Sequence, residues 1–149
     1  MNIGHKTVPL HIQDMRADMA SLDEGIAGHR RTPNLLLIGP DAATRKYLDR
    51  LMASWPSPLR LCDSAEPLLP TEPVQGLVVL DVERLKRRDQ DKLIEWLDGA
   101  GYATPVISTS GRSLFPMVQQ GDFSDTLYYR LNMVTLKLDR AALRTDNPR

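Results

Sequence analysis

The sequence of 149 residues has one cysteine, no net charge and no long apolar run. A single cysteine, Cys62, excludes an internal disulfide and a cysteine-rich zinc site. The 19 basic and 19 acidic side chains cancel, so no long-range field draws the chain to DNA or to an anionic membrane. No apolar stretch approaches the roughly 20 residues of a membrane span. We therefore expect neither direct DNA binding nor a membrane segment.

The amino terminus also lacks the features of a secretion signal. MNIGHKTVPLHIQDMRADM contains acidic residues and no apolar block, so we expect a cytoplasmic protein. The histidines are His5, His11 and His29, and none has an acid or a cysteine at metal-ligand spacing. We expect no metal site.

What the chain does contain is the composition of an ordinary globular protein, with 42% hydrophobic and 26% charged residues. Its length suits one domain with its own hydrophobic core. We divide the chain into an N-terminal helix and linker (1–32), a globular domain (33–139) and a tail (140–149). Residues 1–8 are expected to have no regular structure.

An amphipathic helix is predicted from about Pro9 to Ala27, because apolar residues recur there at spacings of three and four. Its apolar stripe consists of Ile12, Met15, Met19, Leu22 and Ile26. Two interpretations remain open: the stripe packs on the chain's own domain, or it contacts a partner or a second copy. Gly28 ends the helix, and residues 29–33 form a linker.

Beyond the linker, short apolar runs alternate with helical patterns. Strands are predicted at 34–38, 59–62, 76–81, 104–109 and 133–138. Helices are predicted at about 41–55, 88–98, 114–120 and 124–131, with Asp41 capping the first. Residues 64–75, which include three prolines, are predicted to form a loop. This alternation predicts an α/β fold with an open, mainly parallel sheet of five strands.

Three segments that follow or include these strands resemble a known family. Val118–Asn132 is similar to V-x-x-G-x-F-R-x-D-L-Y-Y-R-L-N of the AAA+ domain of bacterial sigma-54 activators. Residues 106–114 resemble that family's sensor strand, V-I-A-A-T-N-R-x-L, and residues 76–83 resemble its Walker B strand, G-T-L-F-L-D-E-I. Gln90 and Leu93 fall where the family has Q-x-K-L-L. The resemblance implies a three-layer, P-loop-like AAA+ core.

The residues that align with the family's phosphate-binding loop depart from its pattern. A working loop reads G-x-x-x-x-G-K-[ST], so that backbone N–H groups surround the phosphates and the lysine reaches the β/γ-phosphates. In the aligned stretch, Gly39–Lys46, Thr44 replaces the second glycine, Arg45 the lysine and Lys46 the hydroxyl residue. Pro40 also has no N–H group. We predict that the phosphate cradle is lost.

Other catalytic positions of the family are changed too. Asp81 matches the magnesium-binding acid of Walker B, but Val82 replaces the acid that orients water, and Glu83 follows one residue later. The sensor asparagine corresponds to Gly111. Of two arginine-finger positions only Arg130 remains, either as a vestigial finger toward a neighbouring subunit or in an ion pair within the chain. These losses argue against ATP hydrolysis, and Asp81 is then a vestigial ligand or a helix-capping acid.

The family's output elements are not found in the sequence either. Sigma-54 activators carry, between their second and third strands, a long insertion whose GAFTGA loop touches the sigma factor. Residues 63–75 span this interval and contain no GAFTGA. The helical lid and the helix-turn-helix module of the family are also missing from the sequence, so we expect the α/β core of a truncated domain.

We therefore predict a non-catalytic AAA+-like regulator of bacterial transcription or signalling with no bound cofactor. Its partner would be a protein, either a true AAA+ activator or a second copy of itself. One alternative is a nucleotide-binding domain with weak ATP and magnesium binding. Its vestigial site would consist of Gly39, Thr44, Arg45, Lys46 and Asp81. The other alternative is a receiver-like domain phosphorylated at Asp81, with Thr109 or Ser110 as the switch hydroxyl, although only one acid follows the first strand.

Overall fold

The structure, a computed structural model, describes residues 5–6 and 32–139. The predicted helix at 9–27, with its stripe of Ile12, Met15, Met19, Leu22 and Ile26, lies outside the described residues, as does the tail. The elements in chain order are β1 (His5–Lys6), β2 (Leu35–Ile38), α2 (Asp41–Ala53), β3 (Leu59–Asp63), β4 (Gly76–Leu80), η1 (Val82–Arg84), α3 (Arg87–Asp98), β5 (Val106–Ser110), α4 (Phe115–Gln119), α5 (Asp125–Leu131) and β6 (Val134–Lys137).

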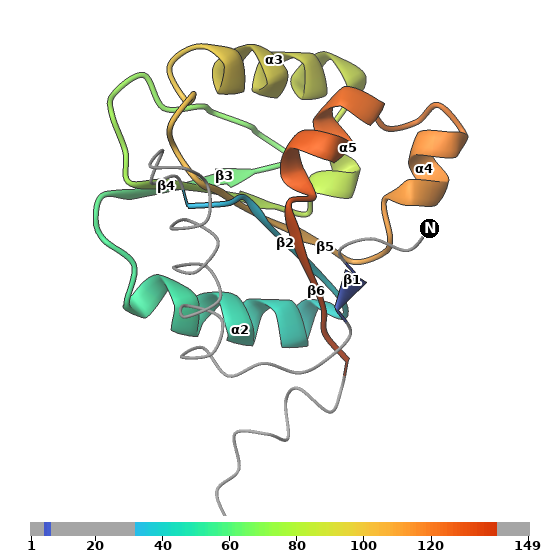
Figure 1. Cartoon of the computed structure of the whole chain (residues 1–149), viewed down its shortest axis with the longest axis horizontal. Helices are drawn as coiled ribbons and strands as arrows, with labels where there is room; N and C mark the ends of the chain where they lie inside the picture. The colour runs from blue at the N-terminus through green and yellow to red at the C-terminus, as the bar shows by residue number, and fades with distance from the viewer. Residues whose placement is uncertain (1–4, 7–31, 140–149) are drawn as a thin grey trace, which may run out of the picture.

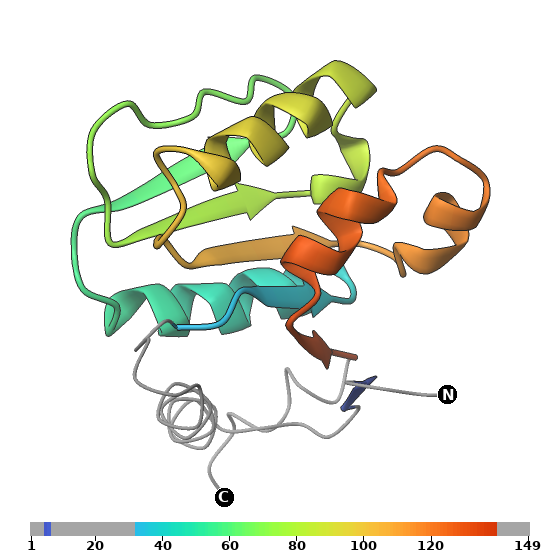
Figure 2. The same cartoon turned by 45° about the horizontal axis from the view of Figure 1, so that its top comes forward.

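All the strands pair in parallel in one sheet, in the order β1-β6-β2-β5-β4-β3. Helix α2 covers one face, and α3, α4 and α5 lie on the other (Figures 1 and 2). This three-layer arrangement confirms the predicted α/β fold with a parallel sheet. The prediction that residues 1–8 have no regular structure was wrong for His5–Lys6, which pair with Thr135 and Leu136 of β6. Pairing through backbone groups needs no apolar run, so the sequence gives no sign of this short strand.

The strand order contradicts the receiver-like alternative. When the five longer strands, β2 to β6, are numbered 1 to 5 along the chain, the order β6-β2-β5-β4-β3 becomes 5-1-4-3-2. Receiver domains have the flavodoxin-like order 2-1-3-4-5. The sequence could not distinguish the two, because the alternation of strands and helices is the same in both.

The hydrophobic core lies on both faces of the sheet. Successive side chains of a strand point to opposite faces, so Leu35 and Leu37 of β2 pack with α2, and Leu36 packs with the helices of the other face. The continuous apolar runs predicted from the sequence reflect this two-sided burial. Between β3 and β4, residues 64–75 form the predicted loop, and the Trp96 indole N–H of α3 donates to the Pro70 carbonyl at 3.0 Å.

Two helix starts differ in their capping from what the sequence suggests. Helix α2 begins at Asp41 itself, Pro40 occupies the N-cap position, and no side chain caps the helix. The prediction that Asp41 caps α2 was therefore wrong, because the helix starts one residue earlier than a cap at Asp41 requires. Helix α5 has a side-chain cap: the Ser124 hydroxyl accepts a hydrogen bond from the Leu127 N–H at 3.2 Å. Ser124 stands at the first arginine-finger position of the family.

Candidate functional site

The carboxyl end of β2 leads into α2 through Gly39 and Pro40 alone. The Gly39 N–H donates to the Ser110 carbonyl at 3.0 Å, and the Thr44 N–H donates to the Pro40 carbonyl at 3.0 Å. A Cβ at Gly39 would overlap the Leu138 carbonyl oxygen, so glycine is required here by the close approach of the backbone after β6. Both N–H groups at the aligned glycine positions are thus already used within the chain.

Thr44, Arg45 and Lys46 all lie inside helix α2 rather than in a loop before it. Thr44 is buried, and its hydroxyl donates to the Asp41 carbonyl at 3.1 Å. Arg45 is exposed and pairs with the Asp41 carboxylate one turn before it, at 3.5 Å. Lys46 is half-buried. The helix therefore begins within the stretch that would have to wrap a phosphate.

Asp81 follows β4 at the same edge of the sheet, in a left-handed backbone conformation with φ 54° and ψ 53°. Its N–H donates to the Thr109 hydroxyl of β5 at 2.9 Å. The side chain makes no capping hydrogen bond to η1, so the interpretation of Asp81 as a helix-capping acid was wrong. Burial raises the pKa of its carboxyl, the nearby Glu83 raises it further, and Arg84 and Arg45 oppose this shift.

Glu83 points across the edge toward β5. Its Oε2 accepts a hydrogen bond from the Gly111 N–H at 3.1 Å, and its Oε1 is buried with no hydrogen-bond partner among the described residues. The 3-10 turn η1 sets this direction, which the strand pattern alone left undetermined. Val82, at the position of the water-orienting acid, is fully buried in the core. The structure thus brings Gly39, Arg45, Asp81 and Glu83 to one edge without a phosphate loop.

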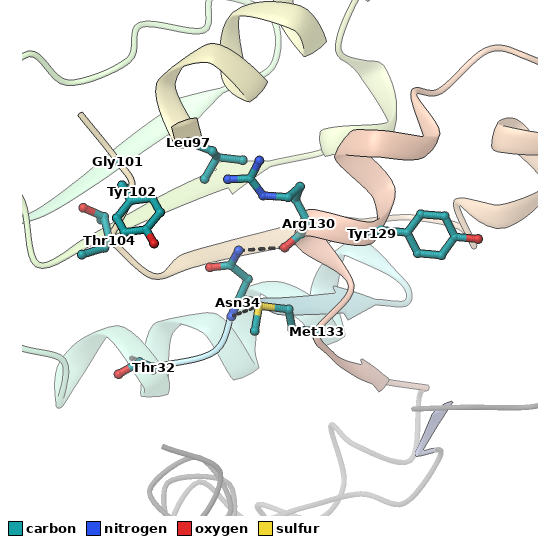
Figure 3. A pocket seen from close by; sticks show the side chains of 10 residues that line it. Thr32, Asn34, Leu97, Gly101, Tyr102, Thr104, Tyr129, Arg130 and Met133 are labelled. Carbon is teal, nitrogen blue, oxygen red and sulfur yellow. Dashed lines mark hydrogen bonds between the residues drawn. The ribbon is translucent and has the colours of Figure 1, made fainter. Parts of the chain in front are cut away.

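Arg130 lies at the opposite edge of the sheet. Its guanidinium Nη1 is 2.6 Å from Asp98 Oδ1 of α3, which confirms the predicted ion pair within the chain. The Arg130 carbonyl accepts from the side-chain amide of Asn34 at 2.7 Å (Figure 3). Asn34 Oδ1 accepts from the Val106 N–H at 2.8 Å. Because Asn34 precedes β2 and Val106 begins β5, these bonds fix α5 to the amino ends of the central strands.

A pocket of about 410 Å³ opens beside this ion pair (Figure 3). Large apolar side chains around it are exposed: Tyr102 by 63%, Tyr129 by 66% and Met133 by 50%. The lining residues are Thr32, Asn34, Leu97, Gly101, Tyr102, Ala103, Thr104, Tyr129, Arg130 and Met133. Sequence analysis missed this pocket, because its walls come from segments that lie up to a hundred residues apart.

Gln90 has a structural role that the sequence did not reveal. It is 1% exposed, and its side-chain N–H groups donate to the carbonyls of Leu85 and Asp122 at 3.0 and 3.2 Å. Its Oε1 accepts from the Ser124 N–H at 2.8 Å. Gln90 therefore ties α3 to the turn between α4 and α5, which explains a glutamine at this position of the family pattern.

Within residues 5–6 and 32–139, no cluster of three or more His, Cys, Asp and Glu side chains has the arrangement of a metal site. None of the helices in these described segments has both the length and the apolar character needed to cross a membrane.

Comparison with known proteins places this geometry in a family. Among solved structures, NtrX from Brucella abortus in complex with ATP is similar, with a TM-score of 0.60 and 17% identity over 95% of this chain and 40% of that chain. NtrX in complex with ADP has a TM-score of 0.56 and 17% identity over 90% of this chain and 37% of that chain. This chain thus spans less than half the length of these structures, and the likeness concerns the fold. No curated protein sequence matches the chain significantly.

The sequence itself matches a family model. The model, described as the sigma-54 interaction domain, matches residues 10–140, which is most of the chain. The match includes strands β2 to β6 and every helix described above, whereas β1 lies outside it. This chain belongs to the sigma-54 interaction domain family and has its AAA+ α/β core.

Proposed function

We propose that the chain is a non-catalytic regulator of bacterial transcription or signalling that acts through protein contacts. The short connection of Gly39 and Pro40 between β2 and α2 carries this proposal. A phosphate loop needs free backbone N–H groups that point at the ligand and a hydroxyl that binds magnesium. The N–H groups of Gly39 and Thr44 are hydrogen-bonded to carbonyls, and the Thr44 hydroxyl is buried on the Asp41 carbonyl. These bonds engage the N–H groups at both aligned glycine positions, and Lys46 occupies the position of the magnesium-binding hydroxyl.

The residues that follow β4, which align with the Walker B motif, also support the absence of ATP hydrolysis. Phosphoryl transfer depends on an acid or amide that orients the attacking water. Val82 is buried in the core, and Glu83 is engaged with the Gly111 N–H. Asp81 and Glu83 lie at the same edge of the sheet as the aligned phosphate stretch, and Asp41 adds a further negative charge there that opposes phosphate binding.

Protein contacts are favoured by the pocket beside α5. Tyrosine, arginine and methionine are common at protein interfaces, and exposed apolar side chains gathered around a pocket are typical of a contact surface. Tyr102 and Met133 form such a group with Arg130, whereas the exposed Tyr129 ring points away from the pocket and packs edge-on against Tyr128 (Figure 3). The family to which the chain belongs suggests a true AAA+ activator, or a second copy of this chain, as the partner.

A second candidate function is nucleotide binding without hydrolysis. NtrX has been crystallised with ATP and with ADP, and Arg45 lies close enough to Asp81 in this chain to lower the pKa of its carboxyl. A cation and an acid at the open edge of the sheet could hold a nucleotide weakly.

Two measurements on the whole chain test the proposal. Calorimetric titration with ATP and with ADP, each with magnesium, should give no heat, and phosphate release from ATP should equal the buffer blank. Micromolar binding without turnover would favour the second candidate, and turnover would overturn both.

Self-association, or association with a purified sigma-54 activator, should be seen by analytical ultracentrifugation. Tyr129→Ser with Met133→Ser should weaken it. The matched control is Leu68→Ser, which removes an equally exposed apolar side chain (69%) from the loop between β3 and β4. Equal behaviour of the two variants would place the contact elsewhere.

A further inference from the structure

Five exposed cations gather around the start of α3, and we call them the basic surface. They are Arg84, Lys86, Arg87, Arg88 and Arg112. Arg84 ends η1, Lys86 is the N-cap of α3, and Arg87 and Arg88 lie in its first turn. Arg112 follows β5. The hydrogen bond between Glu83 and the Gly111 N–H brings the residues next to them, Arg84 and Arg112, to the same edge of the sheet. In a chain whose charges cancel, this is a local concentration of positive charge.

The fold accounts for only part of these charges, since Arg87 donates to Gln90 Oε1 at 3.5 Å and to the Gly121 carbonyl at 3.4 Å. Among the described residues, the side chains of Lys86 and Arg112 have no hydrogen-bond or ion-pair partner. Arg88 makes only a long contact with Asp89, at 3.8 Å. The amino end of a helix carries a positive partial charge that favours acids, so cations in the first turn of α3 oppose the helix dipole. Cations that do not stabilise the helix are available to bind an anionic group of another molecule.

Acidic residues limit the extent of the basic surface. Asp91 lies one turn beyond Arg87 on α3, and it is exposed. On the other side, Arg87 reaches the Gly121 carbonyl at 3.4 Å, next to the exposed Asp122. A long phosphate backbone that crossed this surface would also meet these exposed carboxylates, whereas a short acidic peptide would meet the exposed cations, with only the half-buried Glu83 and the buried Asp89 among them.

We infer that the basic surface binds a short acidic segment of a partner protein. The inference goes further than the proposed function, on which it rests for the protein nature of the ligand. It concerns the carboxyl edge of the sheet, whereas the pocket beside Arg130 lies at the amino edge. Charge complementarity of this kind sets the rate and the selectivity of association and is weakened by salt.

The test uses the full chain and a fluorescein-labelled decaglutamate peptide, with binding followed by fluorescence anisotropy at low salt. Lys86→Glu with Arg112→Glu should weaken binding about tenfold or more, because both side chains are exposed and unpaired. The matched control is Arg60→Glu with Lys137→Glu, which makes the same change in net charge at exposed positions on β3 and β6. The control should change binding by less than about twofold.

Three results would overturn the inference: no binding of the peptide by the wild-type chain, an equal loss in both double variants, or tighter binding of a DNA duplex than of the peptide. The peptide-binding assay contains no ATP. ATP turnover would therefore overturn the proposed function without changing the peptide result. Failure to bind the peptide, with no turnover, would remove this inference alone.

Discussion

Glu83 accepts a hydrogen bond from the backbone N–H of Gly111 at 3.1 Å, and this bond joins the ends of β4 and β5. The contact couples two positions that depart from the family pattern, a displaced acid and a lost asparagine. The contact also has an electrostatic effect on Asp81. The Glu83 carboxylate is held near Asp81, where it adds to the effect of burial and raises the pKa of the Asp81 carboxyl.

The raised pKa of Asp81 predicts a dependence of stability on pH. The native state binds this proton more tightly than the unfolded state, so Asp81 does not affect stability below the ordinary pKa of an aspartate. As pH rises from there through the raised pKa, ionisation of Asp81 lowers the free energy of unfolding. Asp81→Asn should therefore raise the melting temperature at pH 7 and have little effect near pH 3. Asparagine also tolerates the left-handed backbone of this residue.

Thermal unfolding followed by circular dichroism at the two pH values measures this effect. Asp91→Asn, an exposed change on α3, is the control for a generic loss of one negative charge. If both variants shifted the melting temperature equally at pH 7, the local origin of the Asp81 effect would be excluded.

Gln90 should be the most sensitive polar residue of the α3 side. Replacement by leucine keeps the volume but leaves the Ser124 N–H and the carbonyls of Leu85 and Asp122 without their partner. Each buried group that loses its hydrogen bond costs about 1–3 kcal/mol, and we expect about 3 kcal/mol in all. Urea unfolding measures the loss. Gln119→Leu, at an exposed position of α4, should stay within about 0.5 kcal/mol.

Ser124 tests whether an arginine-finger position has become a structural one. Ser124→Ala removes the cap of α5 and should lower the free energy of unfolding by about 1 kcal/mol. Ser124→Arg, which restores the residue of the family, should cost a similar amount, whereas Ser124→Asp keeps a capping oxygen and should be close to wild type. A stable Ser124→Arg variant would argue that the cap has no structural weight.

The sequence was sufficient to predict the strands and helices of residues 34–138 but not the order of the strands. Runs such as Leu77–Leu80 are buried on both faces, and this double burial gives a continuous apolar signal. Strand order depends on which helices cross which face, and the local pattern contains no such information. The resemblance of Leu127–Asn132 to the family predicted an AAA+ core, and the structure then gave the order of the strands.

The candidate site was predicted less completely than the fold. The substitutions at Thr44 and Arg45 could be identified in the sequence, because a phosphate loop has a fixed spacing. The start of the helix at about residue 41 was predicted, but the hydrogen bonds made by the Gly39 and Thr44 N–H groups could not be identified in the sequence. The direction of Glu83 depends on a single 3-10 turn, and its contact with Gly111 spans two strands.

The short connection of Gly39 and Pro40 between β2 and α2 gives the last prediction. Thr44→Gly, Arg45→Lys and Lys46→Thr together restore the G-x-x-x-x-G-K-T pattern from Gly39 onward. We expect this triple variant still to show no ATP binding by calorimetry, because the N–H group of residue 44 stays bonded to the Pro40 carbonyl inside the helix. The Gly39 N–H also remains bonded to the Ser110 carbonyl.

Circular dichroism should show that the triple variant is folded, with some loss of stability from the glycine in α2, about 1 kcal/mol. Thr44→Ala is the control for removal of the buried hydroxyl alone. Micromolar ATP affinity in the triple variant would mean that the side chains, and not the length of the β2–α2 connection, prevent binding. In that case the loss of the phosphate site would lie in three substitutions, and the backbone of the ancestral loop would still be accessible to this fold.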